Sequence, residues 1–485
     1  MPHTTIPNST AGPQRVVIVG GGVTGLSAAH RLDDIARAQR RPIEIILLEA
    51  SDRLGGVIRT HRRDDYLIES GPDQFITARP WAVDLARRLG IDGEIQPTTG
   101  PHPRVLIGRG ARLLPLPEGF MVMAPTRMWP MATTPLLSWR GKCRAIMDLL
   151  LPARREDGDE SIAAFIRRRF GREMLDRIVE PLIGSIYGAP LDQLSVRATM
   201  SRFVELEQKD RSLILAMRRQ GKKRSSAGAG TGGPRYGMFV TFRNGLQTLV
   251  DALTARVGNF ARLGVEVRAI ERTGTDAPRY HVALGDGGRI DADAVLVAAP
   301  GPSATKLLSS LDEALTGSLA SIPYGSTSIV HLAYRRDQVG HALDAYGIVC
   351  PPDERGAVNA ASFSSIKYPG RAPDDMVLLR GIVKPDRCDG DASDDSLAAA
   401  AHGQFSEWLA IRGAPAFSSV DRWDRVLAHY RVGHPDRIAG IEQRLEQYPG
   451  LELAGNAYRG VGIPDCIHSG ETAAERLAGG LGSRV

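Results

Sequence analysis

Three glycines with a fixed spacing follow a short apolar run near the start of the chain. Residues 15–25 read RVVIVGGGVTG, in which Gly20, Gly22 and Gly25 fit the spacing G-x-G-x-x-G. Gly20 permits a tight turn, Gly22 leaves room for a phosphate beside the backbone, and Gly25 lets a helix pack closely on the preceding strand. The helix N-terminus offers N–H groups to an anion. The pattern predicts nucleotide binding.

An acidic residue and a glycine pair extend this pattern. A second β-rich run, PIEIILLEA, ends near Glu49, which can accept hydrogen bonds from a ribose diol and argues against a 2′-phosphate. The next residues, SDRLGGVIRT, place Arg53 beside Gly55 and Gly56. A glycine pair lets the backbone run close to a phosphate or a ring, and an arginine can neutralise pyrophosphate charge. The first 60 residues therefore predict strand, turn, helix and strand around a dinucleotide.

A further turn selects between the possible cofactors. ESGPDQF (69–75) follows, and its Gly71 and Pro72 would lie beside a flavin. Together with the earlier motifs, this segment resembles the flavin-containing amine oxidase and porphyrinogen oxidase superfamily, whereas NAD dehydrogenases do not continue in this way. The resemblance implies FAD, and the absence of a cysteine motif for covalent attachment predicts that FAD is held non-covalently.

The rest of the chain predicts a discontinuous architecture. We expect helices over 81–90 and 161–184, a strand, turn and helix over 239–257, and strands over 263–273 and 280–300. At the C-terminus, LELAG leads to Gly455, then to Gly460–Ile463 and a final helix, whose positive dipole end can face the pyrimidine end of a flavin. The two ends of the chain are thus expected to build one domain.

The resemblance becomes more specific in the middle of the chain. EPLIGSIYGAPLDQLS, RSLILAMRR, FRNGLQTLV and AGNAYRGVGIPDCIHSG resemble the oxygen-dependent porphyrinogen oxidases of haem synthesis, and most closely the bacterial branch that oxidises coproporphyrinogen III. The implied fold class is α/β: a discontinuous Rossmann-type FAD domain, a mixed-sheet substrate domain and an α-helical insertion. The expected ranges are a polar tail (1–14), the FAD domain (15–94, 235–300 and 421–485), the helical, membrane-facing insertion (95–234) and the substrate domain (301–420).

The resemblance also implies which residues hold FAD. Gly20 to Gly25 would contact the pyrophosphate, Glu49 and Ala50 the ribose, and Val267 and Trp423 the adenine side. The full predicted set is Gly20, Gly21, Gly22, Val23, Thr24, Gly25, Glu49, Ala50, Arg53, Gly55, Gly56, Val57, Gly71, Pro72, Asp73, Gln74, Val267, Trp423, Gly455, Val461, Gly462 and Ile463.

The implied reaction is a six-electron oxidation of coproporphyrinogen III, or of protoporphyrinogen IX, to the porphyrin, with O2 reoxidising the flavin and giving H2O2. The flavin carries the electronic work, so no side chain is nominated as a catalytic acid or base. The substrate needs an apolar slot and cations for its propionates. Arg79 is either such a cation or a surface arginine, and Lys222, Lys223 and Arg224 are either such cations or part of a solvated glycine- and serine-rich loop over 221–233. His468 lies beside the expected flavin segment and could tune the ring.

Three alternatives stay open. A flavin amine oxidase would need an aromatic cage near the flavin, for which Trp423, Tyr430 and Tyr458 are candidates. A carotenoid desaturase would need a longer lipid-facing insertion. A flavin-binding scaffold without turnover is the third.

The segment 101–152, rich in Met and Trp, either packs in a core, guards an oily channel or rests on a membrane surface.

Composition bounds the partners and the location. With 485 residues the chain should form about three domains. Its net charge of +6 is small for this length and is spread along the chain, which predicts no nucleic-acid partner. The four cysteines form no CxxC motif, so no metal site is expected and a reducing compartment fits. We expect a cytoplasmic protein with its porphyrinogen and O2, and with a membrane surface or neighbouring haem-pathway enzymes as further partners. The oligomeric state is left open.

Overall fold

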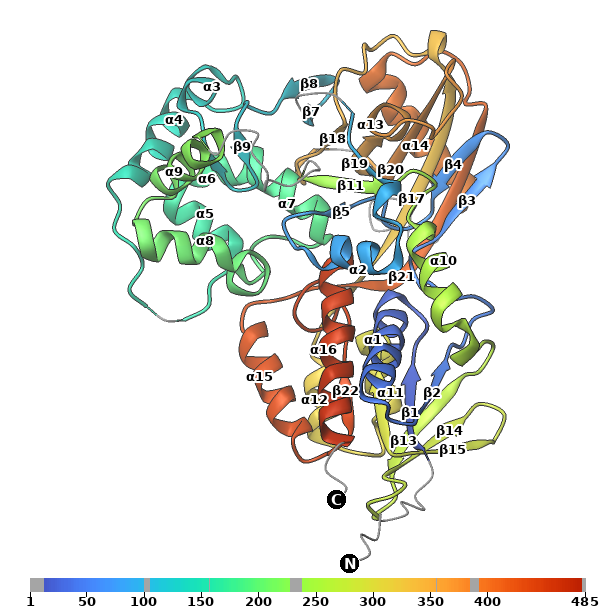
Figure 1. Ribbon diagram of the computed structural model, residues 1–485. Coiled ribbons are helices and arrows are strands. Elements are labelled where there is room, and N and C mark those ends of the chain that lie inside the picture. Colours follow the sequence, from blue (N-terminus) through green and yellow to red (C-terminus); the bar gives the residue numbers. More distant parts are fainter. Residues whose placement is uncertain are drawn as a thin grey trace, which may run out of the picture.

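A five-stranded parallel sheet draws its strands from both ends and the middle of the chain. The computed structural model describes residues 13–99, 105–156, 158–226, 238–354, 356–383 and 392–481. The sheet order is β12-β2-β1-β16-β22 (Figure 1). Its strands are β1 (Gln14–Val19), β2 (Ile43–Leu48), β12 (Ala261–Arg262), β16 (Ala294–Val297) and β22 (Leu451–Leu453). The strands β1, β2 and β16 are apolar on both faces because both faces are covered.

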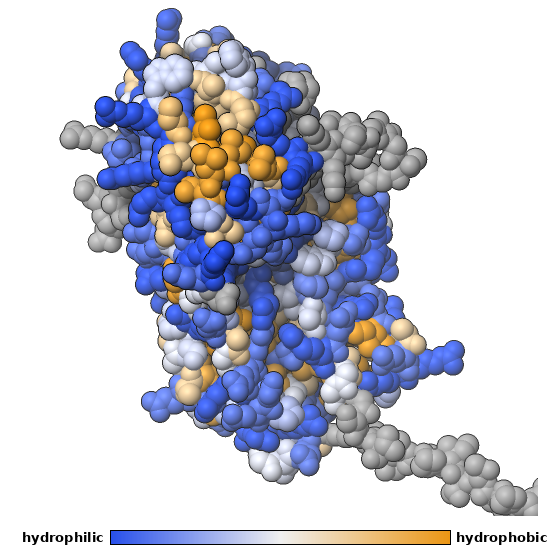
Figure 2. All heavy atoms as spheres, turned by 90° about the vertical axis from the view of Figure 1, so that its left-hand side faces the viewer, coloured by the Kyte–Doolittle hydropathy of each residue, from blue (hydrophilic) through white to orange (hydrophobic). Residues whose placement is uncertain are grey.

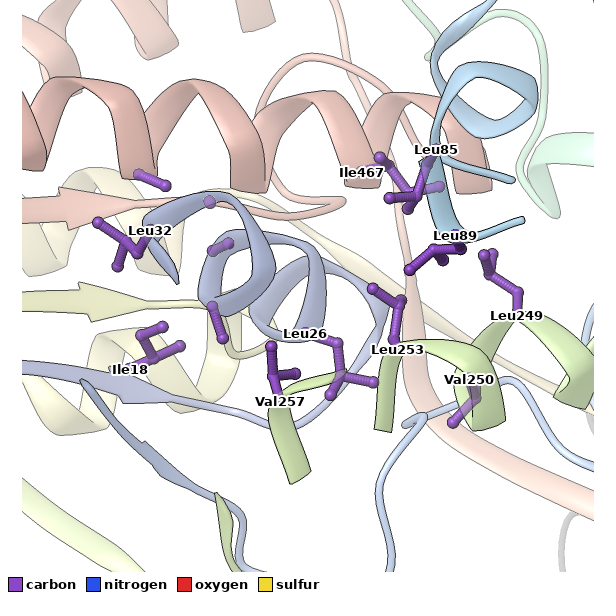
Figure 3. Packing of buried hydrophobic residues seen from close by; sticks show 14 of the residues in the cluster. Ile18, Leu26, Leu32, Leu85, Leu89, Leu249, Val250, Leu253, Val257 and Ile467 are labelled. Carbon is purple, nitrogen blue, oxygen red and sulfur yellow. The ribbon is translucent and has the colours of Figure 1, made fainter. Parts of the chain in front are cut away.

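Helices cover one face of this sheet. The helices are α1 (Val23–Gln39), α2 (Trp81–Leu89), α10 (Gln247–Val257) and α16 (Ile463–Leu481). Ile18 of β1 packs with Leu26 of α1, Leu253 of α10 and Ile467 of α16 in one hydrophobic core (Figure 3). A small sheet, β5-β11-β6, shares this core through Phe75 and other residues. Its strands are β5 (Phe75–Ile76), β6 (Ile95–Pro97) and β11 (Phe239–Phe242). The first and last helices of the chain therefore pack on the same sheet.

The opposite face is covered by a three-stranded antiparallel sheet and three helices. The strands are β13 (Val267–Arg272), β14 (Tyr280–Leu284) and β15 (Arg289–Ala292), and the helices are α11 (Gly301–Leu307), α12 (Glu313–Ala320) and α15 (His434–Leu445). Val17 and Val295 of the parallel sheet share a core with Tyr280, Leu315 and Ile438. The parallel sheet thus lies between a layer of helices on one face and a layer of strands and helices on the other.

A second, mixed sheet of seven strands has the order β21-β17-β20-β19-β18-β7-β8. The strands are β7 (Val105–Arg109), β8 (Arg112–Pro115), β17 (Tyr324–Arg335), β18 (Gly347–Val349), β19 (Val358–Phe363), β20 (Met376–Val383) and β21 (Phe417–Ala428). The helix α14 (Asp394–Leu409) covers one face, where its Phe405 packs with Leu332 and Leu379. A hairpin of β3 (Thr60–Arg63) and β4 (Tyr66–Glu69) packs on the mixed sheet, where Tyr66 and Ile68 share a core with Ala333 and Leu378. The short helix α13 (Ser364–Lys367) lies in the chain between β19 and β20.

The third region is mainly helical and lies beside the mixed sheet (Figure 1). It contains α3 (Met128–Thr133), α4 (Trp139–Ile146), α5 (Ile162–Phe170), α6 (Arg172–Met174), α7 (Glu180–Tyr187), α8 (Val196–Asp210) and α9 (Leu213–Ser226), with the hairpin β9 (Phe120–Met121) and β10 (Ala124–Pro125). Its own core includes Met123, Phe165 and Ile178. Among the described residues, no helix is both long and apolar enough to span a bilayer.

Several boundaries differ from those expected from the sequence. The range 95–234 contains β7 and β8, which join the edge of the mixed sheet because β7 pairs in parallel with β18. The strand β21 remains in the mixed sheet to Ala428, beyond the expected boundary at 420. The strand β1 begins at Gln14, and residues 1–12 of the expected tail lie outside the described residues. These differences arise from pairings between distant segments, for which a local sequence pattern carries no signal.

The expected loop over 221–233 is wrong in its first part, because α9 continues to Ser226. The backbone of Lys222, Lys223 and Arg224 is therefore helical. Residues 227–237 lie outside the described residues.

Candidate active site

One large cavity joins the three regions. Its volume is about 1020 Å³, and its wall is mostly apolar. All residues predicted to bind the cofactor line this cavity except Gly21, Gly25 and Asp73. Further wall residues come from the mixed sheet, such as Ile329 and Ile382, and from α7 of the helical region, such as Ile186. The fold therefore brings the predicted residues of the two chain ends together in one place.

The glycine-rich turn ends in a helix N-terminus that opens into the cavity. Gly22 is the N-cap of α1, its side chain position offers no capping group, and the first turn of α1 contains no acidic residue. A Cβ on Gly22 would meet only Gly56 Cα, at 4.0 Å, so it would project into the free space of the cavity. Uncapped N–H groups beside an open space fit an anionic phosphate.

Gly21 and Gly25 support this turn from behind the cavity wall. A Cβ on Gly25 would lie 1.9 Å from the carbonyl oxygen of Gly20, so α1 can approach β1 only with glycine there. The N–H of Gly21 donates to Glu49 Oε2 over 2.6 Å. The two residues shape the turn, and the expectation that they contact the cofactor directly is not matched by a place in the cavity wall.

Glu49 stands at the end of β2 with its carboxylate already oriented. Glu49 Oε1 accepts hydrogen bonds from the N–H of Ser51 at 2.9 Å and from its hydroxyl at 2.7 Å. The side chain lines the cavity together with Ala50 and Val267. An acceptor held at this point fits the hydroxyl groups of a ribose.

Arg53 holds the glycine pair in its bent path. Its guanidinium donates to the carbonyl oxygens of Leu54 at 3.1 Å and Ile58 at 3.2 Å, and also to that of Gly56. Gly55 has a φ of +107°, which favours glycine. Arg53 and the pair thus form a positively charged part of the wall, and the contact of Arg53 with a pyrophosphate stays a prediction.

Side-chain hydrogen bonds from the mixed sheet and from Tyr368 hold the segment from Ser70 to Gln74 in place. Trp423 of β21 donates to the carbonyl oxygen of Ser70 at 2.7 Å, and Arg380 of β20 donates to that of Gly71 at 2.6 Å. Tyr368 donates to Gln74 Oε1 at 3.0 Å. Gly71, Pro72 and Gln74 line the cavity. Its position is therefore fixed by side chains far away in sequence.

Asp73 differs from its neighbours because it does not line the cavity. Lys367 Nζ lies 3.1 Å from Asp73 Oδ2, and Arg380 Nη1 lies 3.8 Å from Asp73 Oδ1. Burial by itself would raise the pKa of Asp73, but the charges of Lys367 and Arg380 outweigh it and lower the pKa to about 2. Asp73 is therefore an ionised anchor for the segment, and the prediction that it lines the flavin site is not matched by the cavity wall.

The sequence did not reveal which residues line the half of the cavity that is formed by the mixed sheet and α7. Asn359, Arg380 and Ile382 of the mixed sheet line it, and so do Gly184, Ser185 and Ile186 of α7. Ile186 is 57% exposed, an unusual state for an isoleucine that is explained by its place on an open apolar wall. The motif EPLIGSIYGAP contains these α7 residues, so the sequence carried a signal, but its local pattern did not reveal which side chains face a cavity.

At the C-terminal end, Val461, Gly462 and Ile463 line the cavity just before and at the start of α16. Asp465 stands in the first turn of α16, and burial raises the pKa of this carboxyl group. Arg79 Nε lies 3.5 Å from Asp465 Oδ1. Arg79 is thus paired near the flavin-facing turn and outside the cavity wall, and its role toward a propionate stays a prediction.

His468 is exposed and lies outside the cavity wall. Its ring stacks on Trp81 of α2 at a centroid distance of 4.0 Å. The side chain therefore joins α16 to α2, and the structure gives no contact through which it would tune a ring in the cavity.

Two further wall residues bear on the alternatives. Trp423 is the one aromatic side chain in the wall among the described residues, whereas the buried Tyr430 donates to the carbonyl oxygen of Asn456 at 2.7 Å. Tyr458 is also buried and lies outside the wall. The three residues therefore form no aromatic cage. Cys466 lines the cavity, and burial raises the pKa of its thiol to about 12, so the thiol stays protonated.

Comparisons with known proteins show the family to which this chain belongs. Residues 23–478 match the family of flavin-containing amine oxidoreductases. A protein of Propionibacterium freudenreichii named coproporphyrinogen III oxidase is 37% identical over 98% of this chain and 92% of its own length. One of the same name from Bacillus subtilis is 34% identical over 95% of this chain and 97% of its own length.

Among solved structures, an Exiguobacterium protein described as of the protoporphyrinogen oxidase type aligns with a TM-score of 0.82 and 31% identity, covering 96% of this chain and 99% of that chain. The match of the family model extends over nearly the whole chain, from the glycine-rich turn to α16. This chain is a member of the flavin-containing amine oxidoreductase family.

Proposed function

We propose that this oxidoreductase binds FAD and oxidises coproporphyrinogen III to coproporphyrin III. The carrying observation is the single cavity, in which a glycine-rich phosphate cradle continues into an apolar slot formed by β17, β20 and α7. Full-length relatives with this activity in their names support the choice of substrate. Six electrons and six hydrogens leave the macrocycle in three equal steps, and three O2 molecules accept them to give three H2O2.

FAD fits the first half of the cavity. The N-terminus of α1 would hold the pyrophosphate, Glu49 the ribose and Val461 to Ile463 the ring system. When bound, FAD supplies a two-electron acceptor, which no side chain of the wall could provide. The protonated thiol of Cys466 is a weak nucleophile, which supports a non-covalently held cofactor.

The second half of the cavity fits a flat and largely apolar macrocycle. Ile329, Ile382 and Ile186 present aliphatic surface to it, while Asn359 and Arg380 are polar members of the same wall. These side chains would orient the substrate and exclude water. Because their work is positioning, removing any one of them should change binding and rate together.

The test compares two porphyrinogens. The purified holoprotein is mixed anaerobically with coproporphyrinogen III or protoporphyrinogen IX, flavin absorbance is followed, and porphyrin fluorescence is measured after air is admitted. We expect the porphyrinogen to bleach the flavin absorbance and air to restore it. Porphyrin fluorescence should then appear, and the reaction should be faster with coproporphyrinogen III. Equal rates would contradict the substrate preference, and no rate on either would favour an amine oxidase or desaturase, which amine and carotenoid substrates would then reveal.

We also propose that the helical region contacts a membrane surface. Trp129, Trp139 and Leu150 are 78%, 75% and 78% exposed, and Ile146 and Met147 are about half exposed. Figure 2 shows hydrophobic side chains gathered on the face of this region and surrounded by hydrophilic ones. Lys142 Nζ lies 4.7 Å from the centre of the Trp139 ring. Exposed tryptophans beside cations are typical of proteins that rest on anionic lipid.

A further inference from the structure

A buried charge cluster lies behind the segment Ser70–Gln74. Glu69, Asp73, His331, Arg371 and Arg380 surround one small cavity of about 10 Å³. Lys367 joins the cluster through its contact with Asp73. Thr60 Oγ1 donates to Glu69 Oε2 at 2.6 Å, and Arg371 donates to Thr241 Oγ1 at 3.1 Å. Glu69, Lys367, Arg371 and Arg380 are buried, and Asp73 keeps 15% of its side chain exposed.

Around Asp73, positive charge exceeds negative charge, because Lys367 and Arg380 both face its single carboxylate. Elsewhere in the cluster Arg371 stands with Glu69, and a third carboxylate, Asp421, has Oδ2 3.9 Å from Nε2 of His331. Burial and the charge of Arg380 lower the pKa of His331 to about 3, so this histidine is uncharged near neutral pH. Burial of unbalanced charge is costly, since little solvent is present to compensate it. The single carboxylate of Asp73 therefore does not neutralise both Lys367 and Arg380.

Arg380 connects the cluster to the large cavity. Its Nη2 donates to the carbonyl oxygen of Gly71, its Nη1 faces Asp73, and the side chain also lines the large cavity. The Nε atom of Arg380 is buried and has no hydrogen-bond partner among the residues that the structure describes. The guanidinium is thus the member through which the excess charge acts on a group bound in the cavity.

We propose that Arg380, supported by Asp73 and Lys367, raises the reduction potential of the bound flavin. This inference rests on the proposed function, because it requires FAD in the cavity beside Gly71 and Gln74. A ring system gains negative charge when it is reduced, and a fixed cation in a site with little water stabilises that charge. Arg380 is accordingly a positioning and tuning residue and takes no part in proton transfer.

The test measures the flavin of the holoprotein without any porphyrinogen. Arg380→Gln removes the charge and keeps a donor for Gly71, whereas Arg380→Lys keeps the charge. We expect Arg380→Gln to lower the midpoint potential and to weaken sulfite binding to the flavin by about tenfold, or about 1.4 kcal/mol. Arg380→Lys should stay close to the wild type in both measurements.

A second pair of variants separates charge from packing. Lys367→Met removes a cation that lies outside the large cavity wall, and should shift both measurements in the same direction as Arg380→Gln but less. The double variant Asp73→Asn/Lys367→Met removes one charge of each sign and should return both values toward the wild type, although it loses the same ion pair.

Three results would overturn the inference. These are an unchanged potential in Arg380→Gln, equal shifts in Arg380→Gln and Arg380→Lys, and a double variant shifted further than Lys367→Met. A wild-type protein that binds no FAD would instead contradict the proposed function, so the two failures are distinguishable.

Discussion

The glycines of the glycine-rich turn have different structural roles. Gly25 allows α1 to approach β1, since a Cβ there would overlap the carbonyl oxygen of Gly20. Gly22 has no such neighbour and leaves space only for a ligand. A substitution at Gly22 should therefore affect binding without affecting folding, which makes it the better probe of the cofactor site.

We predict that Gly22→Val removes bound FAD and leaves the unfolding temperature of the cofactor-free protein nearly unchanged. The added side chain would fill the space in front of the N-terminus of α1. Flavin absorbance of the purified protein and thermal unfolding of the cofactor-free form measure the two effects. Gly93→Val is the matched control, because a Cβ on this exposed glycine meets nothing within 4 Å. Full FAD retention in Gly22→Val would contradict the phosphate site.

At the scale of elements, a buried aspartate joins two of the helices under the parallel sheet. Asp312 is the N-cap of α12, where Oδ1 accepts from the N–H of Leu315 at 2.9 Å. Its Oδ2 accepts from Arg444 of α15 at 2.6 Å and from Tyr448 at 2.9 Å. Burial would raise the pKa of Asp312, but these three donors outweigh it and lower the pKa to about 2. The carboxylate thus ties α12 to α15.

We predict that Asp312→Ala destabilises the protein by about 2 kcal/mol, from the lost helix cap and the two lost hydrogen bonds. Because the folded pKa lies below that of an unfolded aspartate, its contribution is present above about pH 4 and is lost as the pH falls toward 2. Denaturant unfolding at pH 7 and between pH 4 and 2 checks both statements. Glu313→Ala, at the exposed next position, should cost far less, and an equal loss would contradict the cap.

At the scale of the whole molecule, the cavity exists only because three regions meet. The parallel sheet provides the phosphate cradle, the mixed sheet provides Ile329 and Arg380, and the helical region provides Ile186. The exposed apolar side chains near Trp129 and Trp139 belong to this third region (Figure 2). A membrane contact there would bring lipid close to the part of the protein that completes the substrate slot.

We predict that Trp129→Ser/Trp139→Ser reduces co-sedimentation with vesicles that contain anionic lipid, and that added salt weakens the wild-type binding. FAD content should be unchanged, since neither tryptophan lines the cavity. Leu263→Ser replaces an exposed apolar residue in another region and serves as the control. If the wild type fails to sediment with such vesicles, the exposed side chains have another role.

The sequence by itself determined the local parts of this protein. The glycine-rich turn, Glu49, the helix at Trp81–Leu89 and the strands around the turn at Gly285–Gly288 each follow from neighbouring residues, and local sterics and hydrogen bonding decide them. The segment rich in Met and Trp could be assigned only in part, because Met123 and Met131 enter a core while Trp129 and Trp139 remain exposed.

Only the tertiary structure decided which residues, distant in sequence, line the same cavity or form ion pairs with one another. The pairing of β7 with β18, the contact of Asp73 with Lys367 and the approach of α7 to the cavity join segments separated by more than a hundred residues. Such contacts depend on how whole sheets and helices pack, since packing energy is collected over many side chains and no short motif records it.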